Sequence, residues 1–159
     1  MTCTIKLINY CPVKSLSFQS INSCQIKKNL GMPNDRIFAF SRGIDYEKAK
    51  TIEKNPKERK LNNFLTLKNS PVLNKYNFSY NGNKLTLILD GEEIISISAD
   101  DQNEKSSLSK KLFELESTLI NPIILLKNTE YPFYDTSHSN NVFNSISLIN
   151  LNSIKDFEN

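Results

Sequence analysis

The chain has 159 residues, and its 20 lysines and arginines nearly balance its 17 aspartates and glutamates, which leaves a formal net charge of +3. This length suits one domain, or one domain and the start of another, and it is enough to bury a core. The charges are scattered along the chain, so no basic stripe indicates a nucleic-acid-binding surface.

The cysteines and the apolar runs indicate the cellular compartment of the protein. Cys3, Cys11 and Cys24 are odd in number and lack CxxC spacing, which argues against both a disulfide framework and a zinc site. No basic N-terminal region precedes an apolar core, and no apolar run approaches the ~20 residues of a spanning helix. We therefore expect a soluble, cytoplasmic protein without a membrane partner.

Strand patterns dominate the first forty residues. The β-branched and aromatic residues at 4–10 predict a strand that stops at Pro12, which has no backbone N–H for a ladder. A second strand is predicted around 20–27, and Gly31 then offers the positive φ that a turn often needs. Residues 35–41 carry apolar side chains on both faces, which predicts a central strand.

The segment 44–62 is highly charged and has no apolar period. We expect an exposed loop, with a helical turn at most, because this segment cannot bury enough apolar surface to offset its ordering entropy. Strand character resumes at residues 64–68.

Residues 76–98 carry the clearest local pattern of the chain and predict a three-stranded meander. Asn81-Gly82 suits a type I′ turn, and Asp90-Gly91 reverses the chain again. Between these turns the apolar residues of one face are Leu85, Leu87 and Leu89.

One amphipathic helix is expected at about 102–119. Its leucine stripe follows steps of four, three and four residues and consists of Leu108, Leu112, Leu115 and Leu119. Asp101 followed by Glu104 is a capping signature for its start. Asn121-Pro122 blocks continuation, and 123–127 predicts a strand. The helix should lie across an open end or edge of the sheet. The expected class is therefore mainly β, in an α+β arrangement.

The last residues begin a pattern that they do not complete. Residues 147–151 resemble the entrance to a strand or helix, and little chain follows for them to pack against. We expect a chain that is cut short.

Several motifs occur together in an order that resembles MOSC-domain proteins, the relatives of the molybdenum cofactor sulfurase C-terminal region and of the mitochondrial amidoxime-reducing component. They are "YCPVKSL", "LGMPNDRIFAF", "FLTLKNSPVL", the meander, the leucine helix and "YDTSHSNNVFNSISLINLNSI". The resemblance implies an N-terminal MOSC-type β-barrel domain over 1–127 and the start of an incomplete MOSC domain over 128–159.

The resemblance also implies a site. In that family, residues matching Lys14, Ser15 and Arg36 hold the phosphate end of the molybdopterin cofactor. The residue types suit this role, because arginine offers a planar fork, lysine a compact charge and serine a short neutral donor. The alternatives are a solvated turn for Lys14 and Ser15, and for Arg36 a surface ion pair with Asp35 or another acid, worth about 0–1 kcal/mol.

The implied function is that of the molybdenum-cofactor-binding part of an oxidoreductase or sulfur carrier, whose partner would be an electron- or sulfur-donor protein. The family's reactive cysteine lies in a region beyond Asn159, and no cysteine here matches it, so we expect no catalysis by this chain alone. The competing hypothesis is a non-enzymatic β-barrel module that binds a protein or single-stranded nucleic acid. Nucleic acid is disfavoured, because no aromatic residues interleaved with arginines mark one sheet face.

Two other reactive residues receive no catalytic role. His138 lies beside Asp135, Ser137 and Ser139, but neighbours on a short polar loop rarely converge into a triad. Nothing near Cys11 in the sequence would lower its pKa, so we expect it to be a small packing residue.

Overall fold

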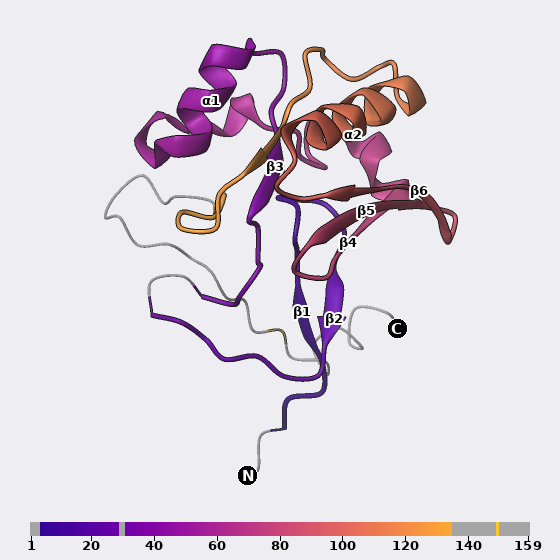
Figure 1. Cartoon of the computed structure of the whole chain (residues 1–159). Helices are drawn as coiled ribbons and strands as arrows, with labels where there is room; N and C mark the ends of the chain where they lie inside the picture. Colours follow the sequence, from indigo (N-terminus) through magenta and orange to yellow (C-terminus); the bar gives the residue numbers. More distant parts are fainter. Residues whose placement is uncertain (1–3, 29–30, 135–148, 150–159) are drawn as a thin grey trace.

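A computed structural model describes residues 4–28, 31–134 and 149 and shows a mixed α+β fold (Figure 1). The described part contains two α-helices, α1 (Tyr46–Lys54) and α2 (Gln102–Leu115). Its seven strands are β1 (Ile8–Tyr10), β2 (Gln19–Ile21), β3 (Phe38–Phe40), β4 (Tyr76–Tyr80), β5 (Lys84–Leu89), β6 (Glu92–Ser98) and β7 (Leu125–Lys127). Three short 3-10 helices lie at Pro56–Glu58, Leu61–Asn63 and Pro71–Lys75.

The strands form three antiparallel sheets, which are β1–β2, β3–β7 and β4–β5–β6. This arrangement confirms the α+β class. Within the described ranges the three sheets do not close into the expected barrel. Figure 1 shows the β1–β2 ribbon extending away from the end of the molecule where the two helices lie.

The predicted meander is confirmed, and its two turns differ. Asp90 (φ 52°) and Gly91 (φ 84°) form a two-residue loop between the paired Leu89 and Glu92, as a type I′ turn requires. In the first turn only Gly82 has a positive φ, and the Asn81 side chain accepts hydrogen bonds from the backbone N–H groups of Asn83 and Lys84. The type I′ turn centred on Asn81-Gly82 was therefore a wrong prediction. Asn81 does not adopt the left-handed conformation of a type I′ turn; its side-chain oxygen instead accepts the hydrogen bonds that hold the turn.

The β3–β7 pair separates two hydrophobic clusters. Phe38, Phe40 and Leu125 pack into the larger cluster, whereas Ala39 and Leu126 pack into the smaller one. Successive side chains of a strand point to opposite faces, so both faces of this pair are covered. The prediction of a strand with two buried apolar faces is confirmed, although the strand is shorter than 35–41. Its predicted central position is not confirmed, because β3 and β7 form a two-stranded sheet and the contact of β3 with Val13 is an isolated bridge.

The other predicted strands near the N-terminus are shorter than expected or absent. Within 4–10 only β1 forms, and of 20–27 only the first residues belong to β2. The strand predicted at 64–68 was wrong, since only Phe64 makes a bridge, to Ser41. The Asn69 side chain donates to the Phe64 carbonyl and accepts from the Thr66 N–H, which turns the backbone that a strand would have kept extended.

The exposed loop predicted over 44–62 was also wrong, because α1 occupies its first half. The Asp45 carboxylate accepts a hydrogen bond from the Lys48 N–H and begins the helix. Ala49 and Ile52 are fully buried in the smaller cluster, so two apolar residues suffice to dock this helix. Glu53 is buried too, and its carboxylate accepts from Lys50 Nζ and from the backbone N–H of Lys127, at 2.8 Å each.

The predicted amphipathic helix is confirmed as α2, which contacts β6, the outer strand of the meander, and β7. Leu108 and Leu112 are fully buried. The helix ends at Leu115 rather than at 119, and Leu119 is buried beyond its end. At the end of α2, the Glu116 carboxylate accepts from the Tyr76 hydroxyl at 2.9 Å, which ties this end of the helix to β4.

Asp101 caps the N-terminus of α2, and its removal should destabilise the chain. Its carboxylate accepts from the N–H groups of Asn103 and Glu104, at 2.8 and 3.0 Å. We expect Asp101→Ala to lower the free energy of unfolding by about 1 kcal/mol, because two N-terminal donors lose their partner. Urea denaturation measures this loss. Asp101→Ser keeps a capping oxygen and should unfold near the parent midpoint; an equal loss in both variants would contradict the capping role.

Two further predictions concern membranes and the C-terminal segment. None of the helices within the described ranges has the length and apolar character needed to cross a bilayer. His138, Asp135, Ser137 and Ser139 lie outside the described residues, as do residues 147–151 apart from Ile149. The prediction that His138 and its neighbours form no triad therefore stays a prediction, as does the predicted domain over 128–159.

Candidate functional site

The two segments that carry the predicted site residues pair directly with each other. The Arg36 N–H donates to the Cys11 carbonyl at 2.6 Å, and the Phe38 N–H donates to the Pro12 carbonyl at 3.0 Å. The Lys14 N–H donates back to the Phe38 carbonyl at 2.8 Å. This parallel pairing places Lys14 and Arg36 on adjacent stretches of backbone.

A third segment, Phe133-Tyr134, contacts both residues. Lys14 Nζ donates to the Phe133 carbonyl at 3.0 Å, and the Phe133 N–H donates to the Arg36 carbonyl at 2.7 Å. The Arg36 guanidinium carbon lies 4.6 Å from the centre of the Tyr134 ring. Burial, with a smaller contribution from Asp35, raises the pKa of Tyr134 to about 12, so its phenol is neutral at physiological pH. Three distant pieces of sequence thus meet at one place.

Ser15 and Arg36 both have left-handed backbone conformations, with φ of 59° and 52°, and Asn34 has a φ of 65°. Such values are uncommon outside glycine, and where the surrounding structure enforces them they cluster at functional sites. Lys14 is only 3% exposed, and its ammonium lies 5.9 Å from the centre of the Phe64 ring. A solvated turn therefore does not describe Lys14, whereas Ser15 is half-buried.

Asp35 fixes the geometry of Arg36. Its Oδ2 accepts from Nε and Nη2 of Arg36, at 2.9 and 2.7 Å, and its Oδ1 accepts from the Cys11 N–H at 2.9 Å. The predicted Arg36–Asp35 pair exists, but it is not a surface pair, because Asp35 is 2% exposed. Sequence reasoning missed this bridging role. The only signal was an acidic residue at the entrance to an apolar strand.

Cys11 is a buried thiol whose Sγ donates to the Val13 carbonyl at 2.8 Å. Burial raises the pKa of Cys11 to about 11, so the group is neither a thiolate nor a nucleophile at neutral pH. The expectation of a packing residue is confirmed.

Arg59 holds the segment that precedes Phe133, and sequence reasoning missed it because it falls in the predicted loop. Its guanidinium donates to four backbone carbonyls at 2.7–3.0 Å, those of Ile52, Glu53, Tyr131 and Pro132. The guanidinium carbon also lies 4.1 Å from the centre of the Phe133 ring. Burial lowers the pKa of Arg59 to about 10, which still leaves a cation at neutral pH.

The site brings the Lys14 ammonium and the Arg36 guanidinium, which is bound to the Asp35 carboxylate, to one segment, and Ser15 follows Lys14 in the chain. This donor set suits an anion with several oxygens. Within the described ranges, no group of three or more histidine, cysteine, aspartate and glutamate side chains is placed to hold a metal ion. Comparisons of the chain with protein-family models, with curated proteins and with solved structures found no match.

Proposed function

We propose that Lys14, Ser15 and Arg36 bind the phosphate end of molybdopterin, in a MOSC-type oxidoreductase or sulfur carrier. The observation that carries this proposal is the convergence of Lys14 and Arg36 on Phe133-Tyr134. The β-barrel over 1–127 belongs to the same proposal, with the meander and the β3–β7 pair as parts of its wall. An electron- or sulfur-donor protein would be the partner of the assembled protein.

The residues present fit a phosphate in charge and in donor type. Lys14 and Arg36 bring two cationic side chains to the same Phe133-Tyr134 segment, and cationic donors of this kind suit phosphate oxygens. The burial of Lys14 and Asp35 lowers the local dielectric, so an anion bound here would be attracted more strongly than at an exposed site. When bound, the molybdenum cofactor supplies the redox or sulfur-transfer chemistry of the resembled family; the role proposed for these residues is to hold its phosphate.

Each residue has a separate part in this proposal. Lys14 supplies a point charge whose position the Phe133 carbonyl fixes. Arg36 supplies a planar guanidinium, which is oriented by its hydrogen bonds to Asp35 and by its contact with the Tyr134 ring. Ser15 follows Lys14 in a left-handed backbone conformation and would add a small neutral donor.

Binding of pyrophosphate and of molybdopterin to the purified chain tests the proposal. We expect Lys14→Met and Arg36→Met each to weaken binding about tenfold or more, because a hydrogen bond to a charged group contributes roughly 1.5–3 kcal/mol. Isothermal titration calorimetry measures the affinities, and circular dichroism checks that each variant is folded.

The matched control is Lys84→Met, which removes an exposed lysine at the start of β5. It should bind both probes as the parent does. Parent-like binding by the double variant Lys14→Met/Arg36→Met would refute the site, as would a parent chain that binds neither probe.

A further inference from the structure

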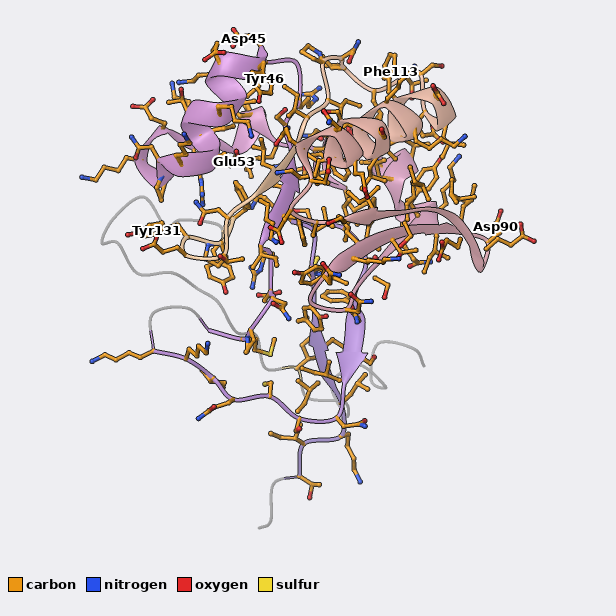
Figure 2. All side chains as sticks on the ribbon, in the orientation of Figure 1. Asp45, Tyr46, Glu53, Asp90, Phe113 and Tyr131 are labelled. Carbon is orange, nitrogen blue, oxygen red and sulfur yellow. The ribbon has the colours of Figure 1, made fainter. Side chains whose placement is uncertain are left out.

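A cavity of about 250 Å³ lies between the first turn of α1, one face of α2 and the segment that leads into β7. Its apolar wall includes Tyr46, Phe113 and Ile123. Figure 2 shows Tyr46 on α1 and Phe113 on α2, both at the end of the molecule away from the β1–β2 ribbon. Pockets for drug-sized ligands measure roughly 300–1,000 Å³, so this cavity suits a smaller molecule.

Lys105 is the buried charge on the wall of this cavity. The residue is 8% exposed, yet its ammonium makes no hydrogen bond or ion pair with any residue that the structure describes. The two acidic residues nearby already have other partners. Glu53 accepts from Lys50 Nζ and the Lys127 N–H, and Asp100 accepts from Lys127 Nζ at 2.7 Å.

The surroundings of Lys105 make its charge costly. Burial is the largest cause of its lowered pKa; Lys50 and Lys127 lower it further, while Glu53 and Asp100 act in the opposite direction. A buried ammonium without a counter-ion is unfavourable, and an anion beside it compensates the loss of water. The Lys105 ammonium therefore lacks a counter-ion among the described residues of the cavity wall.

The other polar groups of the wall define which anion fits. The Ser106 and Ser109 hydroxyls donate to the helix carbonyls of Gln102 and Lys105, at 2.9 Å each, so their protons are engaged. Lys110 lies at the rim, with its side chain 80% exposed. Gln102 and Asn121 also line the cavity, and their side-chain oxygens accept from Lys50 Nζ and from the Ile123 N–H. A largely buried ammonium beside the apolar side chains of Tyr46, Phe113 and Ile123 suits a singly charged group that carries an apolar body.

We propose that this cavity binds a small organic acid, with its carboxylate on Lys105 Nζ and its apolar part against Tyr46 and Phe113. The site is separate from Lys14 and Arg36, neither of which lines the cavity. It does not depend on the proposed molybdopterin function.

Benzoate is the probe, titrated into the ¹⁵N-labelled full chain and followed by NMR chemical shifts. We expect saturable shifts at the amides of Tyr46, Phe113 and Ile123. Lys105→Met keeps the length and packing of the side chain but removes the charge, and it should weaken benzoate binding at least tenfold. Benzamide, which has the same ring without the charge, should also bind at least tenfold more weakly.

Two variants provide the controls. Lys111→Met removes a lysine of α2 that does not line the cavity, and Lys14→Met removes the other proposed anion ligand; both should bind benzoate as the parent does. A second readout needs no variant, since benzoate should raise the pKa of Lys105 followed by ¹³C-methyl NMR after reductive methylation. Equal binding of benzoate by Lys105→Met, equal binding of benzamide, or no saturable shift in the parent would each overturn the proposal.

Discussion

Replacement of Asp35 by alanine is expected to lower the free energy of unfolding by about 2–4 kcal/mol, because it removes one partner of a largely buried ion pair. The Asp35 carboxylate is the acceptor for both the Cys11 N–H and the Arg36 fork. Without it, the buried Cys11 N–H loses its acceptor, and the Arg36 guanidinium, with only 23% of its side chain exposed, loses the Asp35 carboxylate. The paired segments at 11–14 and 36–38 should loosen together.

Two further variants separate the contributions to this loss. Asp35→Asn keeps an oxygen for the Cys11 N–H but loses the charge facing Arg36, so its midpoint in urea should fall between those of the parent and the alanine variant. Asp100→Ala removes a carboxylate that is 77% exposed and paired with Lys127, and should cost at most about 1 kcal/mol. If Asp35→Ala unfolded no more easily than Asp100→Ala, the bridging role of Asp35 would be wrong.

The parts of the fold that the sequence predicts well are those with a local physical cause. The meander follows from alternation and from turn residues such as Asp90-Gly91, which act within a few residues of chain. The α2 helix follows from its leucine stripe and from the Asp101 cap. The double apolar character of β3 likewise indicated a strand covered on both faces.

The missed features depend on contacts between distant segments. The 44–62 segment is rich in charged residues, yet Ala49 and Ile52 complete a cluster whose other buried members are Phe64, Phe133 and one residue each of β3 and β7. The sequence pieces containing Lys14 and Arg36 could be named, but nothing local indicated that Phe133-Tyr134 would join them. Asp35 and Arg59 act on backbone groups, and such contacts leave no periodic pattern to find.

Replacement of Arg59 by methionine is expected to lower the free energy of unfolding by about 2–4 kcal/mol, because it removes several hydrogen bonds from a charged, partly buried group. The guanidinium joins the end of α1, through the carbonyls of Ile52 and Glu53, to the carbonyls of Tyr131 and Pro132. Figure 2 shows Tyr131 on the loop that lies below α1. Methionine retains the apolar stem but removes the Arg59 donors from all four carbonyls, of which that of Glu53 keeps a hydrogen bond from the Asn128 side chain.

The variant should also affect the candidate site, because Phe133 lies directly after the segment that Arg59 holds. The Phe133 carbonyl accepts from Lys14 Nζ, its N–H donates to Arg36, and its ring lies under the Arg59 guanidinium. In Arg59→Met, amide hydrogen exchange at Phe133 should accelerate more than exchange in the meander, because local opening precedes global unfolding. Hydrogen exchange followed by NMR measures both regions in one experiment.

Lys60→Met is the matched control, since this exposed neighbour makes no capping hydrogen bond with its side chain. Its unfolding midpoint and its Phe133 exchange rate should equal those of the parent. Arg59→Lys should recover only part of the loss. One ammonium cannot bind the carbonyls at the end of α1 and those of Tyr131 and Pro132 together, as the planar guanidinium does. Full recovery by lysine would show that charge alone matters; unchanged exchange at Phe133 in Arg59→Met would separate Arg59 from the site and confine its role to α1.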